Sequence, residues 1–173
     1  MRKIFVLVCT VVVMFIVGCA KSTPAGPTPP TGSFVVSLSP ESPAPADVLE
    51  GQLGVEFLEF VLTNSTNSSV TVVGISIRVE GTGTSSSLTK LYLFNSDINI
   101  AEGTTDFDGI VDFDNESGII TVPSGQSISI KVKADIANGT SGQTIYTSFQ
   151  GIIANFQPVI KFPLSGSVMT VVI

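Results

Sequence analysis

The side chains that could do chemistry in this sequence are mostly carboxylates and hydroxyls. Histidine and tryptophan are absent, and both cysteines, Cys9 and Cys19, fall within the first 19 residues. Nucleophilic catalysis by serine or cysteine needs an adjacent base, for which imidazole is the usual choice. Zinc sites need cysteine or histidine ligands. The residue types therefore argue against a catalytic triad and against a zinc centre.

Calcium is the one metal that the acidic residues could bind. Of the 14 acidic residues, half lie between positions 97 and 116, and no Lys or Arg lies among them. Carboxylate oxygens on loops are the ligands that Ca²⁺ prefers. The segment DFDG (106–109) begins like an EF-hand loop, although the later acidic ligands of that motif are missing. The candidate ligands are Asp106, Asp108, Asp112 and Asp114. The alternative is that these carboxylates lie on turns and solvent-facing strand faces and keep the domain soluble.

A serine acylase motif, S-x-x-K, occurs at Ser87-Leu88-Thr89-Lys90. That chemistry needs the serine and lysine on successive turns of a helix, with partner motifs that this sequence lacks. In a strand, residues three apart point to opposite faces, so we interpret the match as chance. We expect no enzymatic activity, and a small hydrolase is the remotest alternative.

Two aromatic residues are the candidate ligand contacts. In LTKLYLF (88–94), alternation places Leu91 and Leu93 on the inner face of a strand and Tyr92 and Phe94 on the outer face. An exposed Tyr92–Phe94 pair could contact a protein partner or a glycan. The alternative is that the rings pack under a loop or against a second sheet.

The N-terminus has the organisation of an export signal. Arg2 and Lys3 precede an apolar run, 4–17. As a helix this run would span roughly 21 Å, which is shorter than the ~30 Å hydrocarbon core of a membrane. Its last two residues and the two that follow, Ile16-Val17-Gly18-Cys19, resemble the lipobox of bacterial lipoproteins. In that family the cysteine sulfur receives a diacylglyceryl group and the chain is cut just before it. The resemblance implies a signal peptide at 1–18 and a lipidated Cys19; ordinary secretion and an uncleaved anchor are the alternatives.

The predicted location is the cell envelope, with the membrane as a partner through lipidated Cys19. Two or more acyl chains hold a protein stably on a bilayer. In the lipoprotein family an Asp after the cysteine favours the inner membrane, and this chain has Ala20. The resemblance thus implies the outer membrane if the host has two membranes, and otherwise the outer face of the cytoplasmic membrane. Residues 19–32 would form a Pro-rich linker, reaching roughly 40 Å if it is extended.

The remaining chain, 33–173, is patterned as one β-domain. In SISIKVKAD (127–135) apolar residues alternate with polar ones, which is typical of half-buried antiparallel strands. In the segment 70–80 we expect Val73, Ile75, Ile77 and Val79 to be buried. A bulge near Leu58 is expected because strict alternation breaks down there. The nine predicted strands lie at about 33–39, 55–63, 70–80, 88–94, 109–114, 118–122, 127–135, 143–150 and 168–173.

Three segments carry a family resemblance. VEFLEFVLTNSTNSSVTVVGISI (55–77), LTKLYLF (88–94) and IITVPSGQSISIKVKADI (119–136) resemble the Ig-like modules repeated in bacterial and archaeal surface-layer and cell-envelope proteins. The resemblance implies an Ig-like antiparallel β-sandwich of about seven to nine strands. It implies no active site, because those modules serve as spacers, adhesive elements or assembly elements.

The net negative charge of the chain argues against nucleic acid as a partner. The formal net charge is −6, and no basic cluster is visible, so we expect no nucleic-acid binding. The sequence predicts a non-catalytic cell-envelope lipoprotein whose sandwich is a surface-displayed binding, adhesion or structural assembly module. Its partner would be an envelope protein or a glycan. The alternative is a carbohydrate-binding or calcium-stabilised adhesion module; no cofactor is expected apart from that possible Ca²⁺.

Overall fold

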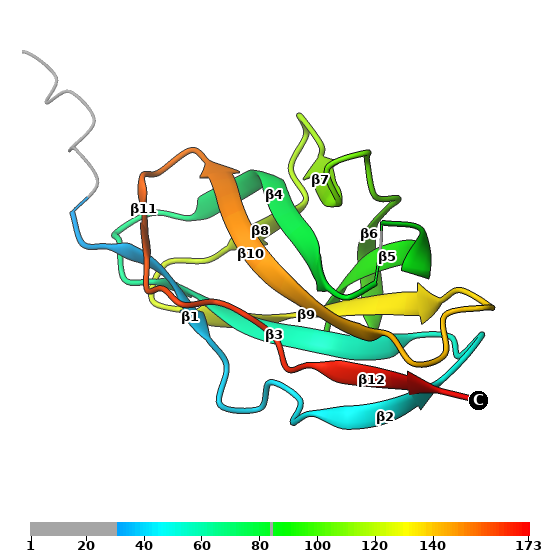
Figure 1. The fold of residues 1–173 in the computed structure, drawn as a ribbon. Coiled ribbons are helices and arrows are strands. Elements are labelled where there is room, and N and C mark those ends of the chain that lie inside the picture. Colours follow the sequence, from blue (N-terminus) through cyan, green and yellow to red (C-terminus); the bar gives the residue numbers. More distant parts are fainter. Residues whose placement is uncertain (1–30, 84) are drawn as a thin grey trace, which may run out of the picture.

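The computed structural model describes residues 31–83 and 85–173, which form a β-sandwich (Figure 1). The described residues contain one short 3-10 turn, η1 (Ser85–Ser87), and no helix long and apolar enough to cross a membrane. The strands are β1 (Phe34–Leu38), β2 (Ala46–Leu49), β3 (Val55–Asn64), β4 (Val70–Gly81), β5 (Leu88–Asn95), β6 (Ile98–Gly103), β7 (Ile110–Asp114), β8 (Ile120–Val122), β9 (Ser127–Ile136), β10 (Thr144–Ala154), β11 (Pro158–Ile160) and β12 (Met169–Val172).

The strands form two sheets. The first has the order β11-β1-β3-β9-β5-β6, and the second has the order β2-β12-β10-β4-β7, with β8 also paired to β4. In Ig domains one sheet contains strands A-B-E-D and the other C-F-G. Here β1-β3-β9-β5 and β4-β10-β12 occupy those positions. The departures are additional strands between β5 and β9 in the chain: β6 pairs with β5 in the first sheet, and β7 and β8 pair with β4 in the second.

The expected β-sandwich and all nine predicted strands are confirmed, but the sandwich has twelve strands, more than the predicted seven to nine. The three additional strands are β2, β6 and β11, each at an edge of a sheet. They bury few side chains, so their sequences carry no inward–outward alternation from which they could be predicted. Two of them also pair in parallel, β2 with β12 and β11 with β1, so the sheets are mixed and not purely antiparallel.

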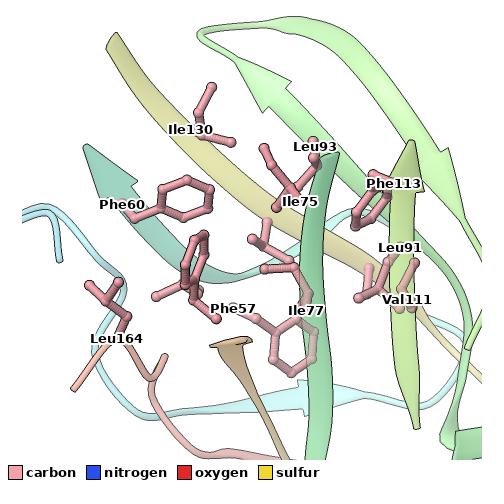
Figure 2. Close-up of a cluster of buried hydrophobic side chains, with 14 of the residues drawn as sticks. Phe57, Phe60, Ile75, Ile77, Leu91, Leu93, Val111, Phe113, Ile130 and Leu164 are labelled. Carbon is pink, nitrogen blue, oxygen red and sulfur yellow. The ribbon is translucent and has the colours of Figure 1, made fainter. Parts of the chain in front are cut away.

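The core lies between the inner faces of the two sheets. Figure 2 shows apolar side chains from β3, β4, β5, β7 and β9 pointing toward one another. Phe60 of β3 and Phe149 of β10 join the two sheets through an edge-to-face contact, with 5.1 Å between ring centroids. Both rings are buried. Aromatic pairs of this geometry contribute beyond the area that they bury.

Two register shifts set which residues face the core. In β3 the pairing with β9 shifts between Glu56 and Leu58, which confirms the bulge predicted near Leu58. In β4 the prediction that Val73 is buried is wrong, because Val72 is fully buried and Val73 only half-buried. The pairing of β4 with β10 shifts beside Gly74, and an extra residue reverses the faces on one side of it.

Residues 161–168, the crossover segment, run from β11 in the first sheet to β12 in the second (Figure 1). Leu164 enters the core with 1% of its surface exposed. Gly166 passes so close to β3 that a Cβ there would lie 2.0 Å from the Phe57 carbonyl oxygen. A side chain at that position would therefore force two backbones apart. The segment is fixed at its centre and closes one side of the sandwich.

Replacing Phe60 tests the contact between the sheets. We expect Phe60→Ala to lower the free energy of unfolding by about 3–5 kcal/mol, because it opens a cavity where both sheets meet. Phe107→Ala is the matched control, since Phe107 is fully exposed and its truncation should change stability by less than about 0.5 kcal/mol. Urea unfolding of both variants measures the difference. Equal effects in the two would contradict the core described above.

Candidate functional site

The predicted contact residues Tyr92 and Phe94 lie on the outer face of the first sheet. Leu91 and Leu93 are fully buried, as alternation predicts. Tyr92 and Phe94 are half-buried and meet edge to face, with 6.3 Å between ring centroids. The structure therefore brings the two rings together on the face that the sequence assigned to them.

The polar groups around these rings are already paired. The Tyr92 hydroxyl donates to Asp135 Oδ2 at 2.6 Å, and Asp135 Oδ1 accepts the Gly54 N–H at 2.8 Å. Lys133 Nζ lies 4.8 Å from the centroid of the Phe94 ring. The hydrogen bond to Asp135, together with burial and nearby negative charge, raises the pKa of Tyr92 to about 12. The hydroxyl of Tyr92 thus donates its proton within the sheet, to Asp135, and not to a ligand.

A second charged group on this face was not predicted from the sequence. The carboxylate of Glu59 is buried and accepts hydrogen bonds from the hydroxyls of Ser39 and Ser129. Lys131 Nζ lies 3.1 Å from Glu56 Oε2 and 3.8 Å from Glu59 Oε2. The hydrogen bond to Glu56 raises the pKa of Lys131. These contacts join β3 and β9 side by side, and we interpret them as structural.

The Tyr92–Asp135 hydrogen bond can be tested by titration. Because the pKa of Tyr92 is raised from its ordinary value of 10.0 to about 12, its contribution to stability is complete below pH 10 and is lost as pH rises toward 12. Tyrosinate absorbance should show one tyrosine ionising near pH 12. Asp135→Asn should move that titration toward pH 10, and Tyr92→Phe should remove it. A Tyr92 pKa near 10 in the unaltered protein would contradict the geometry.

In the acidic segment, 97–116, one carboxylate accepts hydrogen bonds from backbone N–H groups. Asp106 Oδ1 accepts the N–H groups of Asp108 at 2.9 Å and Ile110 at 2.8 Å, which closes the turn before β7. Asp112, on the outer face of β7, accepts the hydroxyl of Ser76. Within residues 31–83 and 85–173, no group of three or more acidic side chains converges as a metal site would require. Asp114 also lies on the outer face of β7 and is exposed. The calcium site stays a prediction, with two of its four ligands engaged elsewhere.

Asp106 and Asp108 provide a matched test of whether the acidic residues stabilise the turn or bind calcium. We expect Asp106→Ala to lower the thermal midpoint by about 3 °C, because two backbone N–H groups lose their acceptor. Asp108→Ala should leave the midpoint unchanged. Neither result should depend on adding millimolar Ca²⁺ or a chelator, as followed by differential scanning calorimetry. A Ca²⁺-induced rise in the midpoint that Asp108→Ala removes would instead support calcium binding.

The S-x-x-K residues have separate partners. Ser87 Oγ donates to Gln143 Oε1 at 2.6 Å, while Lys90 Nζ pairs with Glu102 Oε1 at 2.6 Å. Ser87 is buried at the end of η1, and Lys90 lies on the outer face of β5. This arrangement agrees with the interpretation of the motif as chance. Cys19, the predicted lipidation site, lies outside the described residues, as do the predicted signal peptide at 1–18 and nearly all of the predicted linker.

An open hollow of about 490 Å³ lies on the second sheet, between the middle of β10, the end of β4 and the crossover segment. It was not predicted from the sequence. Its lining residues are Glu80, Ser148, Phe149, Gln150, Phe162, Pro163, Leu164 and Ser165. Phe162 is 64% exposed, whereas Leu164, two residues on, is buried in the core. The segment that supplies one wall is therefore anchored while its aromatic ring stays accessible.

The polar side of the hollow is a chain of hydrogen bonds across β4 and β10. Gln150 Nε2 donates to Ser148 Oγ at 2.9 Å, and Ser148 Oγ in turn donates to Glu80 Oε1. The Tyr146 hydroxyl donates to Glu80 Oε2 at 3.1 Å, which raises the pKa of Tyr146. Arg78 pairs across the strands with Ser148, and its Nε is buried without a hydrogen-bond partner in the described part of the chain. The hollow itself therefore places the carboxylate of Glu80 and the amide of Gln150 next to the exposed ring of Phe162.

Comparisons with known proteins add little to this geometry. No protein-family model matches the chain, and no curated protein matches it. One solved structure that it resembles is AvmM, described as catalysing macrocyclization in alchivemycin A biosynthesis, at 12% identity and a TM-score of 0.36. The match covers 79% of this chain and 85% of AvmM. So remote a likeness carries no argument about fold or activity.

Proposed function

We propose that this protein is a non-catalytic binding module of the cell envelope, tethered through a lipidated Cys19 and displaying its β-sandwich for contact with an envelope protein or glycan. The lipobox resemblance supports the tether. The location is the outer membrane in a host with two membranes, and the outer face of the cytoplasmic membrane otherwise. The Ig-like order of strands agrees with the family of envelope modules that the sequence resembles.

The observation that carries this proposal is the separation between the tether end and the Glu80 wall of the hollow. The described chain starts at Thr31, whose carbonyl accepts the N–H of Asn67 in the β3–β4 loop at 3.2 Å. That loop leads directly into Val70, the first residue of β4, whereas Glu80 lies near the other end of the same strand, and ten residues of strand span roughly 33 Å. Phe162, on the opposite wall, is nearer to the tether end, because the neighbouring Lys161 donates its N–H to the Val36 carbonyl of β1 at 2.9 Å. A tether at Thr31 therefore leaves the Glu80 side of the hollow free to meet a partner.

Three alternatives differ in their support. A carbohydrate-binding module is favoured by the hollow beside Phe162, which combines hydrogen-bonding groups with an exposed ring. Calcium-stabilised adhesion has no comparable support in the described residues, because Asp106 and Asp112 already have protein partners. A small hydrolase has the least support: Ser148 does contact the carboxylate of Glu80, but a carboxylate alone is too weak a base to activate a serine hydroxyl.

The two cysteines allow a controlled test of the tether. We expect Cys19→Ala to abolish incorporation of labelled palmitate and to move the protein out of the membrane fraction, because the acyl chains would have no attachment point. Cys9→Ala is the control, since Cys9 is the other cysteine of the chain, and it should leave both properties unchanged. Palmitate labelling that persists in Cys19→Ala would overturn the lipoprotein assignment.

A further inference from the structure

We propose that the hollow beside Phe162 is a binding site for a neutral, hydroxyl-rich sugar chain. The inference rests on the proposed function, because it names the ligand of that binding module. It also relocates the glycan contact from the Tyr92–Phe94 face of the first sheet to the second sheet. The argument depends on the polar groups, the exposed ring and the charge of the hollow.

The polar groups suit a ligand that both donates and accepts hydrogen bonds. Each oxygen of Glu80 accepts one hydrogen bond from the protein, and a carboxylate has about four acceptor positions. Gln150 uses one N–H on Ser148, so its amide oxygen and second N–H are available. Ser165 adds a hydroxyl to the lining. Each sugar hydroxyl can both donate and accept, so a sugar can satisfy the acceptors and the donors of this lining together.

The Phe162 ring supplies an apolar platform beside these groups. It is 64% exposed, yet its segment is fixed by Leu164 in the core and by Gly166 against the Phe57 carbonyl. A rigid ring costs little ordering entropy on binding. The C–H face of a pyranose ring can lie on such a surface while its hydroxyls reach the polar side.

Charge favours a neutral sugar over an anionic one. Glu80 is the charged residue in the lining, and neither Lys nor Arg appears among the described residues that form it. A uronic acid or a phosphate would be repelled by the negative charge of this carboxylate. Arg78 lies beside the hollow, but Asp112 shares its outer face, so the surroundings do not favour an anion.

The first sheet offers a weaker site for the same ligand. Tyr92 gives its hydroxyl to Asp135, and Lys90 pairs with Glu102. A sugar would have to displace these internal hydrogen bonds before it gained its own. The hollow on the second sheet keeps unused hydrogen-bonding capacity, which is the physical reason for preferring it.

The test uses the full chain, purified in detergent, on an array of neutral oligosaccharides, followed by calorimetry with the best-bound sugar. An anionic oligogalacturonide and a lysine-containing peptide are tested alongside. We expect a neutral oligosaccharide to bind, with an affinity that changes little with salt. Phe162→Ala should weaken that affinity at least tenfold, and Gln150→Ala should weaken it several-fold. Both positions are exposed, so the variants should fold like the unaltered protein.

Phe107→Ala and Tyr92→Ala are the controls. The first removes a fully exposed ring elsewhere on the surface, and the second removes the ring on the other sheet; both should retain binding. Three outcomes overturn the inference: no neutral sugar binds, binding survives Phe162→Ala, or the lysine peptide binds in place of the sugar. If no sugar binds but membrane association still depends on Cys19, the sugar site is wrong and the proposed envelope module is not contradicted. If a sugar binds but membrane association does not depend on Cys19, the tether is wrong and the sugar site is not contradicted.

Discussion

The structure depends on the packing of two apolar sheet faces against each other. The folded part of the chain has no cysteine, so no disulfide links the sheets. Their attachment comes from side-chain contacts, with Phe60 against Phe149 spanning the gap, and from the chain segments that pass from one sheet to the other. Close-packed interiors resist small displacements. The positions of the outer faces, and of every group on them, follow from this core.

The crossover segment connects that core to the surface. Leu164 points into the sandwich beside the phenylalanines of β3 (Figure 2), while Phe162 is exposed. The same few residues thus close the hydrophobic interior and form a wall of the hollow. A surface built on an anchored segment keeps its shape when it meets a ligand, and this matters for the binding role that we propose.

The two outer faces use their polar residues differently. On the first sheet, Lys131 bridges Glu56 and Glu59, and Tyr92 is bound to Asp135. These pairs join neighbouring strands and leave little capacity for a partner. On the second sheet, the hydroxyls of Tyr146 and Ser148 orient the carboxylate of Glu80 without an ion pair in the described residues. One face therefore stabilises the sandwich, and the other retains groups that can bind.

The amino-acid sequence by itself determined the strands that bury one face. Alternation in 127–135 and in 88–94 placed Ile130, Leu91 and Leu93 in the core, because a side chain in a strand has only two directions. It also showed the bulge near Leu58. It could not show β2, β6 or β11, since edge strands bury too few side chains to impose a pattern. The sequence assigned Val73 to the wrong face of β4, because the register shift beside it is seen only in the pairing with β10.

The candidate site required the tertiary structure. Glu80, Ser148 and Phe162 are separated by 68 and 14 residues in the chain, and local periodicity carries no information about which distant segments will meet. The run around Phe162 has no clear period, so nothing in it distinguished the buried Leu164 from the exposed ring. The sequence determined the residue types, the acidic charge and the resemblance of residues 16–19 to a lipobox. Only the closing of one sheet on the other decided which side chains became neighbours, because that choice depends on long-range packing.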